Sequence, residues 1–227
     1  MSSALDGIRV LDFGQYVAGP LAAMLLSDQG ADVIRIDPPG GPRWETTANA
    51  TWNRAKRSVV LDLHSPEDLA TARALVARAD VLIENFRPGV MDRLGLGHEA
   101  TSTTNPQLIY CSLPGFSEED PRAATPAWEG VLGAASGTYV NRLARPSRER
   151  PAVTAIPLSS SYGAFLGATS IAAALNARDR DGVGQRIEVP LFDATFTAVG
   201  STGMKLFDQP PPVGRNAMST PWVNQYQ

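Results

Sequence analysis

The sequence predicts an α/β fold built on a doubly wound parallel sheet. Short runs rich in β-branched residues recur along the first half of the chain, and segments with helical spacing of apolar residues separate them. Strands that alternate with helices favour parallel pairing. With 227 residues, 43% of them hydrophobic and 19% charged, the chain is large enough to bury a core.

The first strand is expected over Ile8 to Phe13, followed by a helix. Pro20 stands where the first helical turn tolerates a missing N–H, and Gly30 is placed to end the helix. The run DVIRID, residues 32–37, predicts the second strand.

The third strand is expected over residues 57–63, with a helix after it. Ser65 is its expected N-cap and Pro66 its first residue, and Glu67 and Asp68 stand near the positive end of the helix dipole. The expected buried stripe consists of Leu69, Ala72, Leu75, Val76 and Ala79.

Two more strands are expected at residues 80–86 and 107–113, with a helical or turn segment between them. The region up to about Leu113 should therefore form the sheet. Asn85 and Phe86 then lie at the carboxyl end of a strand, where α/β sheets place ligands.

The second half changes character. A helix of small residues is expected within 156–175, entered through three serines, and residues 186–194 predict a strand and the start of a further helix. Residues 144–151 are basic and bounded by proline, which indicates a connector. No terminating element is expected from residue 209 on.

Composition excludes several classes of function. A net charge of −3 and a pI near 5.4 give no general reason to expect nucleic acid or an anionic membrane as a partner. The single Cys111 rules out an internal disulfide framework. The N-terminus does not resemble a signal peptide, and the apolar stretch 162–175 is too short to span a bilayer. A cytoplasmic location is expected.

General chemistry motifs are absent. The first strand-to-helix turn, DFGQYVAGP, lacks the G-x-G-x-x-G spacing of a dinucleotide site, and the sequence contains neither a P-loop nor a G-x-S-x-G elbow. Two histidines, His64 and His98, and one cysteine have no metal-ligand spacing, so no metal is expected.

Five longer strings carry a specific resemblance. In this order along the chain, they resemble the class III CoA-transferase (CaiB/BaiF) family, which includes formyl-CoA transferase, carnitine CoA-transferase and α-methylacyl-CoA racemase. The strings are LDGIRVLDFGQYVAGPLAAMLLSDQGADVIRID, NRAKRSVVLDL, ADVLIENFRPGVMDRLGLG, NPQLIYCSLPGF and GVGQRIEVPLFDA.

The resemblance implies a Rossmann-like large domain built from both ends of a chain of about twice this length, with two subunits interlocked as a dimer. Residues 1–205 are then expected to form the N-terminal portion of the large domain. Residues 206–227 are expected to begin the linker toward a C-terminal part that this chain lacks.

The resemblance also implies a site for coenzyme A or acyl-CoA. In it, Arg93 would face the phosphates and Phe86 the adenine. His64 and Pro38 stand where formyl-CoA transferase has a lysine and an arginine, so some phosphate contacts are weakened or replaced. Core packing is the alternative for the apolar members, and a solvated charge is the alternative for Arg93. The full set is Leu61, His64, Asn85, Phe86, Arg93 and Leu94.

The catalytic positions depart from the family. Its transferases use a nucleophilic aspartate just before the small-residue helix, and alignment places that aspartate at Ser160 or, one residue earlier, at Ser159. A serine cannot form the mixed anhydride, and without a neighbouring base it is a poor nucleophile. Capping of the helix start is the alternative role for these serines.

The acid–base pair of the racemase branch is also absent, because Trp128 and Glu129 stand near the expected histidine. Glu129 matches an acidic position near the active site of formyl-CoA transferase and is the remaining candidate for acid–base work, the alternative being a loop glutamate in solvent. The loop from residue 40 to 53, with Trp44 and Trp52, is a candidate pocket wall.

Three functions remain open. The first is a CoA-transferase that moves CoA between an acyl-CoA and a carboxylic acid, with impaired or partner-dependent catalysis. The second is a non-catalytic subunit, paired with a paralogue that carries the aspartate. The third is an acyl-CoA-binding protein without turnover. Either a homodimer or a heterodimer is expected.

Overall fold

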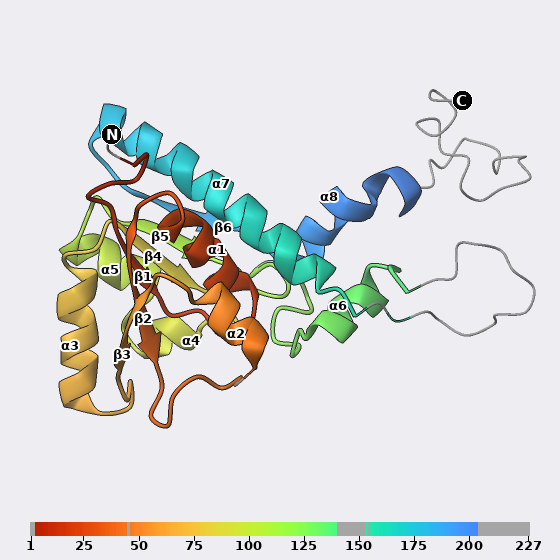
Figure 1. The fold of residues 1–227 in the computed structure, drawn as a ribbon, viewed down its shortest axis with the longest axis horizontal. Coiled ribbons are helices and arrows are strands. Elements are labelled where there is room, and N and C mark those ends of the chain that lie inside the picture. Colours follow the sequence, from red (N-terminus) through yellow and green to blue (C-terminus); the bar gives the residue numbers. More distant parts are fainter. Residues whose placement is uncertain (1–2, 45, 140–152, 154, 204–227) are drawn as a thin grey trace, which may run out of the picture.

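The chain forms a six-stranded, wholly parallel sheet with helices on both faces (Figure 1). The structure is a computed structural model, and it describes all residues except 1–2, 45, 140–152, 154 and 204–227. The strands are β1 (Arg9–Asp12), β2 (Asp32–Asp37), β3 (Arg57–Val60), β4 (Val81–Glu84), β5 (Ile109–Ser112) and β6 (Gln185–Glu188). The α/β class with a parallel sheet is therefore confirmed.

Eight helices lie in the described part of the chain. They are α1 (Ala18–Ser27), α2 (Thr47–Trp52), α3 (Pro66–Val76), α4 (Val90–Arg93), α5 (His98–Thr104), α6 (Glu129–Ala135), α7 (Leu158–Asp181) and α8 (Leu191–Gly203). The predicted helix start at Ser65 and Pro66 is confirmed, although the Ser65 side chain makes no cap hydrogen bond.

The strand order is β3-β2-β1-β4-β5-β6, the Rossmann order. The chain begins at the centre with β1, builds outward to β3, and then crosses back to place β4 on the other side of β1. The direction of winding thus reverses between β1 and β4. In such sheets ligands bind beyond the carboxyl ends of the strands at this switch point, and Asn85 follows β4 there, as the sequence predicts.

The core has two layers because each central strand sends alternate side chains to opposite faces. Val10, Ile83 and Cys111 pack on the face that α1 and α7 cover. Leu11 and Leu82 pack on the other face, with apolar residues of α3. Of the predicted α3 stripe, Ala72, Val76 and Ala79 are buried, and Leu69 and Leu75 lie partly buried against them.

Residues 40–53 differ from the expected loop, because α2 forms within them. Thr46 takes the N-cap position, and its side-chain oxygen accepts a hydrogen bond from the Asn49 N–H at 3.3 Å. A threonine three residues before a free N–H is a recognised helix start, and sequence reasoning overlooked it among the glycines and prolines that precede it.

Helix α7 is longer than its apolar stretch, with 24 residues. By length and composition it is long and apolar enough to cross a membrane, so the sequence argument from residues 162–175 alone was wrong about its length. In the fold, α7 packs against α1, α8, β5 and β6, as a helix that covers a sheet does. The expected connector at 144–151 and the expected linker at 206–227 lie outside the described residues.

Candidate functional site

The loop between β1 and α1 lies at the switch point and is held from two sides. The Asp12 Oδ1 accepts a hydrogen bond from the Gly14 N–H at 2.8 Å. The side-chain amide of Asn85 accepts from the Gln15 N–H at 2.8 Å and donates to the Gln15 carbonyl at 2.9 Å. Asn85 was predicted to contact the cofactor, and here its amide joins the loop after β4 to the loop after β1.

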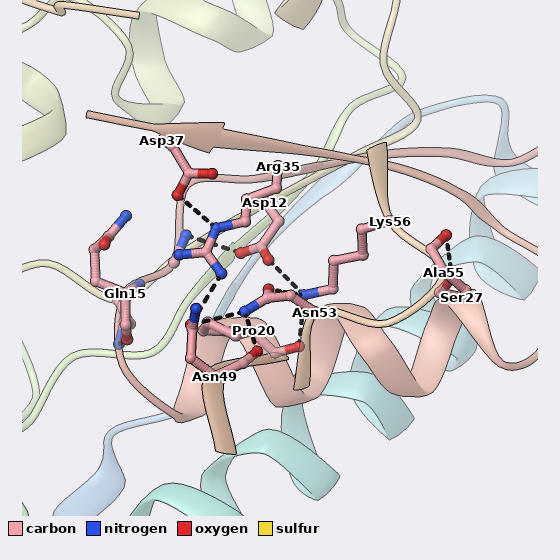
Figure 2. A network of polar contacts seen from close by, with 12 residues as sticks. Asp12, Gln15, Pro20, Ser27, Arg35, Asp37, Asn49, Asn53, Ala55 and Lys56 are labelled. Carbon is pink, nitrogen blue, oxygen red and sulfur yellow. Dashed lines mark hydrogen bonds and ion pairs between the residues drawn. The ribbon is translucent and has the colours of Figure 1, made fainter. Parts of the chain in front are cut away.

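A buried ion pair lies next to this loop, at the end of β1 (Figure 2). The Lys56 Nζ lies 2.8 Å from the Asp12 Oδ2, and the two side chains are 1% and 0% exposed. The ammonium group also donates to the Pro20 carbonyl at 2.8 Å and to the Asn53 Oδ1 at 2.9 Å, so each of its protons has an acceptor. Burial lowers the pKa of Lys56, and the Asp12 carboxylate opposes that shift.

The same network continues to β2 and α2 (Figure 2). The Arg35 guanidinium pairs with Asp37 at 2.7 Å and donates to the Asn49 Oδ1 at 3.3 Å. The Asn53 amide donates to the same Asn49 oxygen at 2.9 Å. Helix α2 is thereby fixed to β2 and, through Asn53 and Lys56, to the end of β1.

Gln15 is a site residue that sequence reasoning missed. The residue is 7% exposed, and its Oε1 has no hydrogen-bond partner among the described residues. A buried polar atom without a partner costs roughly 1–3 kcal/mol, so it is well suited to receive a donor from a ligand. The available signal was position, since Gln15 lies three residues after the first strand of a Rossmann-type sheet.

An aromatic row connects this loop to two helices. Tyr16 has a left-handed backbone with φ of 64°, which is uncommon for an aromatic residue. Its ring lies 5.0 Å from that of Trp128 and 6.5 Å from that of Trp44, and the Trp44 and Trp52 rings are 5.4 Å apart. The tryptophans predicted as a pocket wall therefore lie beside the switch-point loop, together with the residue before Glu129.

The Glu129 carboxylate binds the N-terminus of α7. Its Oε1 accepts from the Ser159 N–H at 2.8 Å, and its Oε2 accepts from the Ser160 N–H at 3.1 Å and from the Ser160 hydroxyl at 2.7 Å. The first turn of α7 contains no acidic residue. Glu129 thus supplies acceptors to N–H groups that the helix itself leaves unpaired.

The contacts of Glu129 contradict two expectations about the serines at the start of α7. Ser160 was expected to have no neighbouring base, but a carboxylate contacts its hydroxyl. The expectation that the serines cap the helix with their own side chains was wrong, because the N-cap is Pro157, no side chain of the helix start makes the cap bond, and Glu129 supplies the acceptors instead. Sequence alone could not show this pairing, since Glu129 and Ser160 are separated by 31 residues.

The structure also separates the two candidate serines. Ser159 is 1% exposed, and its hydroxyl lies 2.7 Å from that of the buried Thr195 on α8. Ser160 is half-buried and directs its hydroxyl to Glu129. Ser160 therefore lies at the site, and Ser159 belongs to the packing of α7 against α8.

The remaining residues expected to bind the cofactor follow β3 and β4. Leu61, Phe86 and Leu94 belong to one apolar cluster, as the core-packing alternative requires. His64 is exposed, with its backbone N–H donating to the Asp62 carboxylate. Arg93 is exposed at the end of α4, and its guanidinium forms no ion pair with any residue that the structure describes.

A cavity of about 380 Å³ lies on the other face of the sheet, beyond β4, β5 and β6. Burial raises the pKa of Glu84 at its floor to about 7, against hydrogen bonds from Ser112 and the Phe86 N–H. Acidic residues outnumber basic ones in its lining. The lining consists of Glu84, Arg87, Pro88, Gly89, Met91, Asp92, His98, Glu99, Tyr110, Ser112, Pro114, Glu118, Arg186 and Glu188.

The side chains that most often bind metals are scattered in the described part of the chain, and its cysteine is buried. No group of three or more His, Cys, Asp or Glu side chains there is arranged to hold a metal ion. Cys111 is buried in the sheet, and burial raises the pKa of its thiol. A buried thiol of this kind is inert.

The sequence profile of CoA-transferase family III matches residues 5–227. Among curated proteins, the chain is 43% identical over 212 residues to CoA-transferase/lyase DddD of Marinomonas sp. (strain MWYL1), covering 91% of this chain and 25% of that protein. It is 39% identical over 201 residues to acetyl-CoA:oxalate CoA-transferase of Acetobacter aceti, covering 84% and 51%.

Solved structures agree with these relatives. A CaiB/BaiF family protein from Brucella suis has a TM-score of 0.82 at 31% identity, covering 89% of this chain and 57% of that one. The protein Rv3272 from Mycobacterium tuberculosis has a TM-score of 0.81 at 34% identity, covering 88% and 58%. The chain thus spans a quarter of one curated relative and about half of the other.

Proposed function

Because the chain belongs to CoA-transferase family III, we propose that it binds an acyl-CoA and takes part in moving CoA between that thioester and a carboxylic acid. The names of its relatives support this substrate class, since they include acetyl-CoA:oxalate and succinate–glutarate CoA-transferases. The switch-point loop supports the same proposal, because the buried Gln15 Oε1 has no hydrogen-bond partner among the described residues and can accept one from a ligand.

The proposed CoA contacts lie along the carboxyl edge of the sheet. Arg93 is exposed and free of ion pairs with described residues, so its guanidinium is available for a phosphate. Phe86 is half-buried and can offer one side of its ring to the adenine. Asn85 acts indirectly in this proposal, by fixing the backbone of Gln15.

The observation that carries the functional proposal is the pair formed by Glu129 and Ser160. A hydroxyl occupies the position where the family's transferases have the nucleophilic aspartate, and the nearest carboxylate is bound by the start of α7. Turnover by this chain alone should therefore be low. We propose that the chain acts in the cytoplasm as a homodimer or a heterodimer, and that full activity depends on the heterodimer, in which a paralogue supplies the aspartate.

The test is CoA exchange between labelled acetate and acetyl-CoA, measured with the chain alone and after mixing with an aspartate-bearing paralogue. We expect the chain alone to exchange CoA slowly and the mixture with the paralogue to exchange it much faster. Fast exchange by a homogeneous sample, unchanged in Ser160→Ala and Glu129→Gln variants, would show that the active site lies elsewhere.

Acyl-CoA binding without turnover is the second candidate. The engagement of both Glu129 oxygens by α7 favours it, because a carboxylate held in this way acts as a helix cap. Calorimetry distinguishes the two candidates: measurable CoA affinity with no exchange under any pairing supports the binding function and contradicts the transferase.

A further inference from the structure

We infer that Glu129, on α6, is the covalent nucleophile of this chain and acts in place of a residue of α7. The inference rests on the proposed binding of acyl-CoA and goes beyond it, because it assigns the atom that reacts. It starts from the Glu129 carboxylate at the N-terminus of α7 and from the unequal contacts of its two oxygens.

The two carboxylate oxygens of Glu129 accept different numbers of hydrogen bonds from described residues. The Oε2 accepts two hydrogen bonds, from the N–H and the hydroxyl of Ser160, and both of its lone-pair positions are therefore engaged. The Oε1 accepts one hydrogen bond among the described residues, from the Ser159 N–H. Among the described residues nothing engages the second lone pair of Oε1, and we assign the attack on a carbonyl carbon to it.

The reaction class requires a carboxylate at this point. Transfer of CoA between two acids passes through acyl groups of comparable reactivity, that is, anhydrides and thioesters. An ester on Ser160 is much more stable than either, so a carboxylate acceptor would not reclaim the acyl group from it. The Glu129 carboxylate is the group that meets this requirement at the start of α7.

The proposed reaction forms an anhydride on Glu129 and then converts it to a CoA thioester. The Glu129 Oε1 attacks the thioester carbonyl, a C–O bond forms, the C–S bond breaks, and CoA leaves as the thiolate with the electron pair. The thiolate then attacks the Cδ of Glu129, the anhydride C–O bond breaks, and the donor acid leaves as its carboxylate. A CoA thioester on Glu129 remains until an acceptor carboxylate attacks it.

The donors around the carboxylate fit this second step. When the thiolate attacks Cδ, negative charge develops on the remaining Glu129 oxygen, and N–H groups and the Ser160 hydroxyl already lie 2.7–3.1 Å from the carboxylate oxygens. Such fixed donors stabilise a tetrahedral oxyanion.

The surroundings leave the group accessible. Glu129 and Ser160 are half-buried, and Trp128, the residue before Glu129, is 56% exposed. The Trp128 ring contacts that of Tyr16, next to Gln15. A thioester held at the switch-point loop is therefore close to the first turn of α6.

The experiment is trapping of the adduct on the full chain with acetyl-CoA and, separately, succinyl-CoA. Intact mass should show a gain of CoA less water, and borohydride followed by peptide mapping should locate a reduced carboxyl at Glu129. Glu129→Gln should abolish the adduct. Ser160→Ala should keep it and form it roughly tenfold to a hundredfold more slowly, having lost one donor. Glu119→Gln, at an exposed glutamate ten residues away, is the matched control and should react as the wild type does.

Each other outcome overturns the inference. An acyl ester mapped to Ser160 in the wild-type chain would make Ser160 the nucleophile. Binding of acetyl-CoA by calorimetry without any adduct would reduce Glu129 to a helix cap and leave the proposed function standing. Absence of binding would overturn the proposed function and this inference together. Mapping uses the wild-type chain, so it does not depend on whether Glu129→Gln folds.

Discussion

At the scale of single residues, the site depends on side chains that bind backbone groups. Asn85 holds both backbone polar groups of Gln15, and Glu129 holds the first N–H groups of α7. In both cases a polar side chain fixes the position of a neighbouring segment that bears a candidate functional residue. Asn85 acts only through the backbone that it positions, whereas Glu129 both fixes the start of α7 and is the group proposed to react.

Arg93→Ala should weaken CoA binding by about 1.5–3 kcal/mol, because a charge-assisted contact to phosphate is lost. Calorimetry measures this effect. Arg180→Ala provides the control. Arg180 is also exposed, but it lies near the C-terminus of α7, just before β6 begins, and so at the amino ends of the strands. Equal affinities for both variants and the wild type would return Arg93 to the role of a solvated charge.

Lys56→Met should lower the free energy of unfolding by about 3–5 kcal/mol, because it leaves the fully buried Asp12 carboxylate without its partner. Urea unfolding measures the loss. The matched control is Arg57→Met, which breaks an ion pair with Asp32 whose side chains are 65% and 45% exposed. That change should cost less than about 1 kcal/mol. Similar losses in the two variants would contradict the importance given to burial.

At the scale of elements, the first turn of α1 and the loop before it fit closely through two glycines. A Cβ on Gly19 would lie 2.6 Å from the Gly14 Cα, a contact with backbone that no side-chain rotation relieves. The close approach lets α1 begin directly beneath the switch-point loop. The loop can therefore keep its shape only with glycine at positions 14 and 19.

Gly19→Ala should therefore destabilise the fold by about 1–3 kcal/mol, through overpacking of the backbone at Gly14. Gly130→Ala is the matched control, because Gly130 is also helical but a Cβ there meets nothing within 4 Å. Alanine's higher helix propensity should make that variant neutral or up to about 1 kcal/mol more stable. Thermal unfolding of the pair tests the difference, and a neutral Gly19→Ala would refute it.

Local sequence patterns predicted the positions of strands and helices but not the contacts between distant elements. Hydrophobic runs placed the strands β1, β2, β4 and β5, because burial on both faces of a parallel sheet leaves a clear local pattern. The edge strand β3 is mostly exposed, and the helix start at Pro66 was predicted from capping residues. The role of Glu129 was not accessible in the same way. It depends on a contact with Ser160 across 31 residues, and no local pattern records such a contact.

At the scale of the whole molecule, the two faces of the sheet have different electrostatic character. The face covered by α1 and α7 is apolar at its centre, and at its carboxyl end it carries the buried ion pairs of Lys56 with Asp12 and of Arg35 with Asp37, beside the switch-point loop. The other face opens beyond β4 to β6 into the acidic cavity, where Glu84 is buried and its pKa is raised to about 7. The stability of the fold should therefore depend on pH through Glu84.

The pH dependence of stability follows from proton binding to Glu84 in the folded and unfolded chains. Between its usual pKa of 4.5 and about 7, Glu84 holds a proton more firmly in the folded chain than in the unfolded one. The resulting contribution to the free energy of unfolding is fully present below about pH 4.5 and is lost as the pH rises through about 7. It amounts to about 3 kcal/mol in total. Glu84→Gln should remove the dependence, so its stability relative to the wild type should increase from pH 5 to pH 8. Parallel urea midpoints across that range would contradict the prediction.

The amide contact between Asn85 and Gln15 joins residues 70 apart in the chain. During synthesis β1 leaves the ribosome long before β4, and the loop after β1 has no Asn85 to hold it until β4 has docked. Closing a loop of this size costs entropy that only the completed sheet centre can offset. The site should consequently mature late in folding, and a nascent chain that stops before β4 should have no organised pocket for CoA.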